Sequence, residues 1–191
     1  MKIFELIDEL KEQYRDDSEV QKTGTLLLGV NAGKPLVSKH EVFKPLEKEI
    51  LDEHINLYKR KFPEQLYQFY RYANGCRLFL RPYYIREYRL AHIGIAINGF
   101  QTLELRMIAT PELLTMPFDL ITDDLRTLKG RPDGLLKAGS IEMEGSERKY
   151  IYINTENNET VITDTDKFNI IDRYENLDEC LCSLFNKCKQ L

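Results

Sequence analysis

Carboxylates form the most prominent group of residues in this sequence that could act chemically. Asp119, Asp123 and Asp124 cluster in one polar stretch, and Glu142, Glu144 and Glu147 follow on a glycine-containing loop. No partner base accompanies the three aspartates, so a solvated acidic loop is the simplest interpretation. Carboxylates that gather on one surface can also attract a basic protein partner and speed its association. These six residues are therefore the predicted partner-binding residues.

An enzyme would need a nucleophile or an acid–base set, and the three histidines do not supply one. His54 lies on an apolar helical stripe and His92 lies between apolar strand residues, so both are predicted to be core or edge histidines. His40 falls in a polar loop with no recognisable partner. We therefore expect a protein that is not an enzyme and that needs no cofactor.

Two patterns resemble metal sites and fail on spacing. Cys180 and Cys188 share one helix face while Cys182 points elsewhere, so one helix cannot direct all three thiols at a tetrahedral zinc ion. Asp164 and Asp166 begin like a calcium loop, but the required glycine and glutamate are absent, and we interpret the segment as a turn. No metal site is predicted.

Charge is unevenly distributed along this chain of 191 residues and net charge −4. The segment 58–90 has eight bases and two acids, whereas the segment from residue 139 onward is mainly acidic. This separation of basic and acidic segments can steer a charged partner toward the protein. Alternatively, the two segments can face each other or face water. The basic and aromatic run CRLFLRPYYIREYRL could bind nucleic acid. Because the chain as a whole is acidic, this run is more simply interpreted as a protein-binding surface or as the solvent-exposed face of a sheet.

The sequence predicts a cytoplasmic protein. No apolar run approaches the roughly twenty residues that a membrane helix requires, and the N-terminus MKIFELIDELKEQYRDD does not have the pattern of a secretory signal. The four cysteines fit neither a zinc pattern nor a dense disulfide framework, which favours a reducing compartment.

Apolar residues at spacings of three and four predict the helices that would position these groups. Asn74-Gly75 is expected to end the third helix, and Asn176 or Asp178 is expected to cap the last one. The expected helices span residues 2–14, 46–58, 63–73 and 177–188.

Strand patterns follow and separate these helices, with Asn98-Gly99 as a strong turn signal. The expected strands span residues 76–80, 91–97, 102–108, 135–143, 150–154 and 160–163, with 91–97 and 102–108 forming a hairpin, and residues 25–30 form a short strand or an extended arm. The order favours one α+β domain over residues 1–191, with an antiparallel sheet of about five or six strands and helices packed on it. Within it we expect a core at 46–191 and an N-terminal helical extension at 1–45.

Three segments together resemble the SUKH superfamily of Smi/Knr-type proteins. FPEQLYQFYRYANGCRLF is similar to the family's first motif, in which a proline opens a helix and Asn-Gly stops it before a strand. LLKAGSIEMEGSERKYIYINTENNETVIT is similar to the second motif, and NLDECLCSLFNKCKQL resembles the closing amphipathic helix. The resemblance covers roughly residues 47–191. It departs from the family at 142–149, where Glu-Gly-Ser-Glu stands in place of Gly-Asp-type residues, so the resemblance assigns no binding role to that loop.

The resemblance implies a non-catalytic protein-binding domain. Bacterial members of this superfamily are regarded as immunity proteins against toxins that are often nucleases, and fungal members act as regulatory scaffolds. We therefore expect an immunity protein that covers the active site of a toxin domain, with a Smi/Knr-type scaffold as the alternative and a nucleic-acid-binding protein as a third possibility. The sequence specifies neither the toxin nor the oligomeric state.

Overall fold

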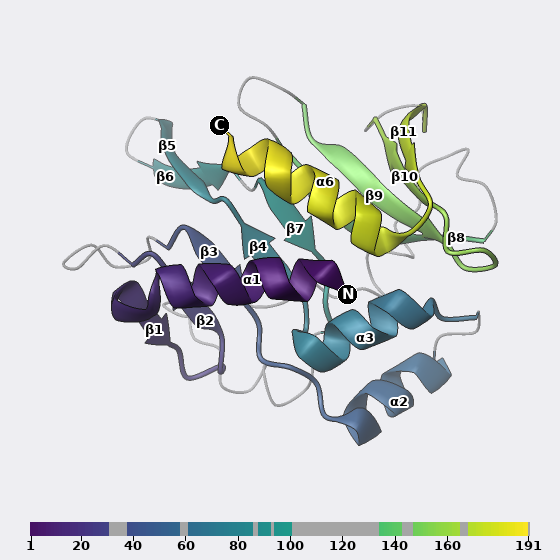
Figure 1. Cartoon of the computed structure of the whole chain (residues 1–191), viewed down its shortest axis with the longest axis horizontal. Coiled ribbons are helices and arrows are strands. Elements are labelled where there is room, and N and C mark those ends of the chain that lie inside the picture. Colours follow the sequence, from purple (N-terminus) through teal and green to yellow (C-terminus); the bar gives the residue numbers. More distant parts are fainter. Residues whose placement is uncertain are drawn as a thin grey trace.

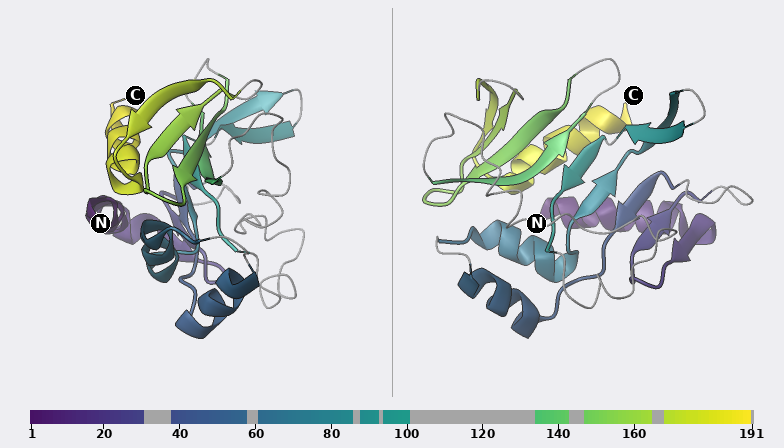
Figure 2. Two further views of the ribbon diagram at one scale, coloured as in Figure 1. Left: turned by 90° about the vertical axis from the view of Figure 1, so that its right-hand side faces the viewer. Right: turned by 180° about the vertical axis from the view of Figure 1, so that it is seen from behind.

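The chain folds as a sheet covered by helices on one face. The computed structural model describes residues 1–30, 38–57, 61–85, 88–92, 94–100, 134–142, 147–164 and 168–190. In this part of the chain, α1, α3 and α6 lie on the same face of the larger sheet (Figures 1 and 2). The predicted α+β class, with helices packed on an antiparallel sheet, is confirmed.

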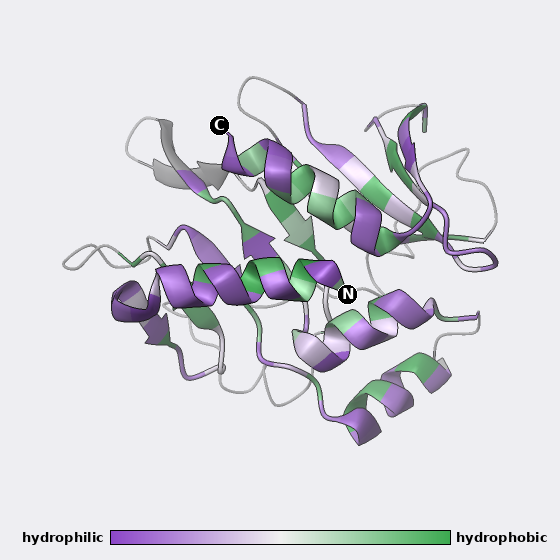
Figure 3. Cartoon of the chain, viewed as in Figure 1, coloured by the Kyte–Doolittle hydropathy of each residue, from purple (hydrophilic) through white to green (hydrophobic). Residues whose placement is uncertain are grey.

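The four α-helices in the described part of the chain match the predicted segments closely. Hydrophobic and hydrophilic bands alternate along α1 and α6 (Figure 3), as expected of helices that bury one side. The helices are α1 (Lys2–Gln13), α2 (Lys48–Leu57), α3 (Glu64–Tyr72) and α6 (Leu177–Lys189), with a short 3-10 helix at Arg15–Asp17. None of the helices in the described part of the chain combines the length and apolarity that a bilayer crossing requires.

The larger sheet has nine strands among the described residues, so the prediction of five or six was wrong. Its order is β1-β2-β3-β4-β7-β8-β9-β10-β11, and all neighbours are antiparallel. The strands are β1 (Ser18–Val20), β2 (Leu26–Leu28), β3 (His40–Val42), β4 (Cys76–Leu78), β7 (Ile95–Ile97), β8 (Leu135–Ile141), β9 (Lys149–Asn154), β10 (Thr160–Thr163) and β11 (Ile170–Tyr174). Residues 1–45 therefore supply α1 and three of these strands.

The segment 91–97 is two strands rather than one. β5 (Arg81–Ile85) and β6 (Tyr88–His92) form a separate antiparallel ribbon, whereas β7 begins at Ile95 and pairs with β4 and β8. Gly94 lies at this break, where an added Cβ would come within 2.8 Å of the Cβ of Phe79. The predicted hairpin partner, 102–108, lies outside the described residues.

One main core lies between the sheet and the helices, and a second small cluster lies on the opposite face. α1 contributes Ile3, Ile7 and Leu10 to the main core, and α6 contributes six residues: Leu177, Cys180, Leu181, Leu184, Phe185 and Cys188. Each fully buried large aliphatic or aromatic side chain stabilises the fold by roughly 1.5–3 kcal/mol. The second cluster consists of Leu135, Tyr152, Val161 and Phe168 at the β8–β10 end.

The link between α3 and β4 is fixed by a buried amide. α3 ends at Tyr72, as the Asn74-Gly75 signal predicted. The side chain of Asn74, which is fully buried, donates to the carbonyl of Phe100 (2.6 Å) and accepts from its N–H (2.8 Å). Gly75 has φ +88°, and a Cβ there would lie 2.5 Å from the carbonyl oxygen of Ile97. This link therefore joins α3 to the end of β7.

Asp178 connects the starts of three helices. Asn176 caps α6, because its side chain accepts from the N–H of Glu179 (3.0 Å). The carboxylate of Asp178 instead accepts from the N–H groups of Lys2 (2.9 Å) and Ile3 (3.0 Å), which begin α1. The N–H of Asp178 donates to the side chain of Gln65 on α3 (3.1 Å). Asp178 therefore caps α1, a helix far away in sequence.

We expect Asp178→Ala to lower the free energy of unfolding by about 1–2 kcal/mol, because two N–H groups of α1 lose their acceptor. Urea denaturation followed by circular dichroism measures this change, which should appear as a lower midpoint. Glu175→Ala, at an exposed position three residues earlier, is the matched control. Equal midpoints for the two variants would contradict the capping role.

His40 lies in β3 and is buried, so its placement in a polar loop was wrong. Its Nδ1 accepts from the N–H of Phe79 (3.2 Å), a residue with φ +58°. The ring also packs against Tyr14 and Phe79. Burial, with a smaller contribution from the Lys39 charge, lowers the pKa of His40 from 6.5 to about 4. His40 is therefore neutral in the folded protein near pH 7.

The depressed pKa of His40 predicts acid sensitivity. Below pH 6.5 the unfolded chain binds a proton that the folded state accepts only near pH 4, so stability falls as the pH decreases through this window. The loss amounts to about 3 kcal/mol at most. His40→Asn, which can keep an acceptor for Phe79, should remove this part of the pH dependence. Unfolding midpoints measured from pH 7 to pH 4 test this, and parallel curves would exclude it.

Candidate functional site

Four of the six predicted binding residues, Asp119, Asp123, Asp124 and Glu144, lie outside the described residues. Glu142 follows β8, and its carboxylate forms an ion pair with Arg148 (3.0 Å). Its side chain is only 15% exposed, so most of its charge is screened from a partner. Glu147 is exposed. Of the predicted residues that can be placed, Glu147 is the better candidate for binding.

Exposed carboxylates gather in two parts of the described chain, one from α1 to β1 and the other around β11 and the start of α6. The segment 156–179 has eight acidic and two basic residues, an excess larger than the net charge of the whole chain. Glu156, Asp172, Glu175 and Glu179 are exposed. One of the two bases, Arg173, forms an ion pair with Glu159 (2.8 Å). The surface formed by β11 and these carboxylates is here called the β11 surface.

The β11 surface also exposes apolar side chains. β11 is the last strand of the nine, and only its β10 side is paired within the described part of the sheet. Ile170 and Ile171 are 39% and 44% exposed. The pairing changes register here, since Ile162 opposes Asp172 while Thr163 opposes Ile170, which makes Ile171 the extra residue of a bulge. Sequence analysis missed this strand because IIDRY does not alternate.

A shallow pocket of about 500 Å³ adjoins the end of β11. It lies where α6 and α1 begin, and Glu175, Asp178, Glu179 and Lys2 are among its lining residues. Glu175 is the residue directly after β11, so the strand and the pocket are continuous along the chain. The acidic character of the pocket wall comes mainly from Glu175 and Glu179, because the Asp178 carboxylate caps α1 and Lys2 adds a positive charge.

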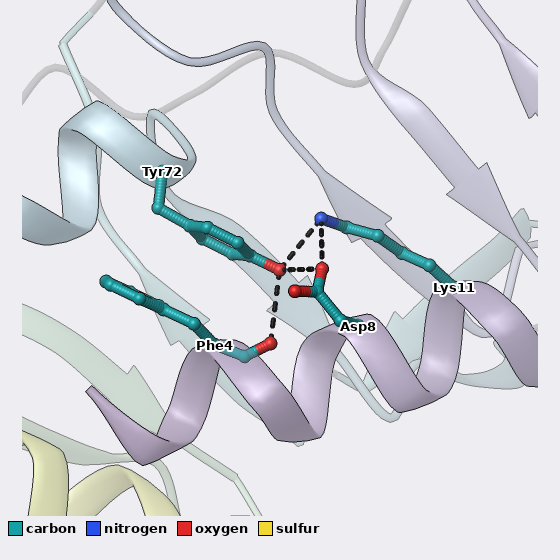
Figure 4. A network of polar contacts seen from close by, with 4 residues as sticks. All are labelled: Phe4, Asp8, Lys11 and Tyr72. Atoms are coloured by element: carbon teal, nitrogen blue, oxygen red, sulfur yellow. Dashed lines mark hydrogen bonds and ion pairs between the residues drawn. The ribbon is translucent and has the colours of Figure 1, made fainter.

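The cluster that most resembles a catalytic group is formed by Asp8, Lys11 and Tyr72, which the sequence did not reveal (Figure 4). The hydroxyl of Tyr72 donates to Asp8 (2.6 Å) and lies 2.7 Å from the Lys11 ammonium. Burial and the hydrogen bond to Asp8 raise the pKa of Tyr72. The phenol therefore keeps its proton, and the cluster joins α1 to α3 rather than acting as a base.

Tyr72→Phe should lower the free energy of unfolding by about 1–2 kcal/mol, because Asp8 and Lys11 lose a hydrogen-bond partner. A double-mutant cycle with Asp8→Ala, measured by urea denaturation, isolates the contribution of the pair. A coupling energy near zero would show that the contact contributes nothing to holding α1 on α3.

One ion pair in the described part of the chain is largely buried, on the sheet face opposite the helices. Glu41 of β3 accepts from Arg77 of β4 (3.0 Å), and Ser38 lies 3.4 Å from the other carboxylate oxygen. Burial raises the pKa of Glu41, while the Arg77 charge and the hydrogen bonds oppose the shift. Because the two residues are cross-strand neighbours, the pair fixes the register of β3 against β4.

The cysteines and the remaining histidines have structural surroundings where they are described. Cys180 and Cys188 are buried and Cys182 is half-buried, as the helical spacing predicted. Burial raises the pKa of Cys180 to about 12 and that of Cys182 to about 11, so both are thiols near pH 7. Nδ1 of His54 lies 2.8 Å from the carbonyl oxygen of Ile50, which confirms its structural role. The side chain of His92 lies outside the described residues.

The described residues contain no group of three side chains that could hold a metal ion. The Asp164 carboxylate accepts from the N–H and the side-chain amide of Asn169 (3.0 and 2.6 Å). The turn predicted between them, with Asp166, falls on 165–167, which lie outside the described residues.

Comparisons of the chain with protein-family models, with curated proteins and with solved structures found no match. The resemblance to the SUKH superfamily, and the immunity function that it implies, therefore stay predictions.

Proposed function

We propose that this protein is a non-catalytic, cytoplasmic protein-binding domain, and specifically an immunity protein that neutralises a bacterial toxin by covering its active site. The observation that carries the proposal is the β11 surface, where exposed isoleucines adjoin a group of exposed carboxylates. Exposed apolar side chains rimmed by charge are typical of surfaces that bind other proteins.

The charge of the surface suggests the class of toxin. A nuclease holds phosphate groups in a basic cleft, and an acidic inhibitor surface complements such a cleft. Long-range attraction between the two would also speed their encounter. The inhibitor itself contributes rigidity, because β10 packs Ile162 into the main core and α6 contacts β11.

The surroundings of the reactive side chains support a role without catalysis. His40 is buried against β4, and the hydroxyl of Tyr72 donates a hydrogen bond to Asp8. Cys180 faces the core as a protonated thiol. In the described part of the chain, each of these groups is engaged in holding the fold together.

Co-purification from the native cell tests the immunity function. The tagged chain should recover a toxin domain in stoichiometric amount, identified by mass spectrometry. Recovery of cell-wall or signalling proteins would favour a Smi/Knr-type scaffold instead. Recovery of the chain alone would count against both.

Charge reversal then tests the surface. Asp172→Lys combined with Glu175→Lys should lower the association rate with the recovered toxin about tenfold at low salt, because electrostatic steering is lost. Stopped-flow or surface plasmon resonance over a range of salt concentrations measures the rate. Glu49→Lys with Glu53→Lys makes the same charge change at exposed positions of α2. Equal rates for the two pairs would exclude the β11 surface as the steering site.

A further inference from the structure

The two edges of the nine-stranded sheet differ in how open they are to another strand. β1 has three residues, whereas β11 has five and spans about 17 Å. All three β1 residues are exposed, but the only large apolar one is Val20 (69%). β11 exposes two adjacent isoleucines. The β11 edge therefore offers the longer and more apolar side to a new strand.

An edge strand directs alternate N–H and C=O groups away from its neighbour, and these groups can pair with an extended segment of another chain. From Asp172 to Tyr174, β11 pairs regularly with β10 on its inner side, so this stretch has strand geometry. The bulge at Ile171 marks where regular pairing stops. A partner strand would thus align with the C-terminal part of β11 and cover the isoleucines at its other end.

Charge indicates which segment would bind. The segment 156–179 has eight acids and two bases. The pocket that adjoins the end of β11 has Glu175 and Glu179 in its wall, beside Lys2 and the Asp178 carboxylate that caps α1. A lysine or arginine side chain on the added strand would be attracted to this pocket. A second copy of this chain would instead bring the same acidic segment against itself, which is unfavourable.

We propose that the β11 edge binds a basic, extended segment of the partner protein as a tenth strand. This inference rests on the proposed protein-binding function and adds the binding mode and the chemistry of the partner segment. Main-chain hydrogen bonds would supply affinity, and the isoleucines and the acidic pocket would select alternating apolar and basic side chains.

Synthetic peptides test the binding mode with the full chain. The probe is a short peptide of alternating lysine and valine. The same peptide N-methylated at alternate residues cannot complete a strand ladder, and a glutamate–valine version reverses its charge. We expect the first peptide to bind and to slow hydrogen exchange of the β11 amides. The other two should bind at least about tenfold more weakly.

Matched variants locate the binding edge. Ile171→Lys should weaken binding of the lysine–valine peptide about tenfold, because it adds a like charge and removes an apolar contact. Val20→Lys makes a comparable change on the opposite edge and should leave binding unchanged. Circular dichroism spectra and urea midpoints of both variants establish that they are folded.

Three results would overturn the proposal: equal binding of the N-methylated peptide, protection confined to the β5–β6 ribbon, or a dimer that the peptide does not dissociate. If a co-purified toxin binds the Ile171→Lys protein normally, the immunity function stands and the strand mode is wrong. If the peptide protects the β11 amides but no toxin is ever recovered, the β11 edge can bind a strand and the immunity function is wrong.

Discussion

The first N–H groups of an α-helix have no acceptor within the helix. In α1, two of these N–H groups have their acceptor in another helix, and this contact holds the helical layer together. Their acceptor is the carboxylate of Asp178, which lies 175 residues or more away along the chain. The N–H of Asp178 also donates a hydrogen bond to the side chain of Gln65 in α3. α1, α3 and α6 are thereby held together at their starting ends, and their apolar faces cover one side of the sheet together. The Tyr72 cluster holds α1 to α3 further along.

The sequence predicted the elements with a strong period and missed those without one. α1, α3 and α6 have apolar residues every three or four positions, and the structure confirms them to within a residue or two. Strands of three residues such as β1 and β3 are too short to show alternation, so the sheet was predicted too small. Contacts between distant segments were also beyond local reasoning, as with Asn74 and Phe100 or His40 and Phe79.

The sequence predicted an acidic binding surface, but none of the six predicted residues belongs to the β11 surface. Acidic side chains are its main feature, as expected, and Glu147 is exposed. Glu142 is paired with Arg148 because the chain reverses between β8 and β9, and charge counting along the sequence does not reveal which carboxylates have such partners. The apolar part of the surface was not predicted, because two adjacent isoleucines in a sequence suggest a buried strand. Ile170 and Ile171 are exposed because β11 is the last strand of the sheet.

The capping of α1 by Asp178 also constrains the order in which the protein can be assembled during synthesis. α1 leaves the ribosome well before its acceptor, because Asp178 lies 176 residues after Lys2 along the chain. The strands from β8 to β11 and helix α6 follow one another both in sequence and in space, so they can form with short loop closures. α3 can already cover part of α1 at an earlier stage, but the start of α1 stays uncapped until this later unit is formed. That end of the helix is therefore accessible to chaperones while the residues between α1 and Asp178 are translated.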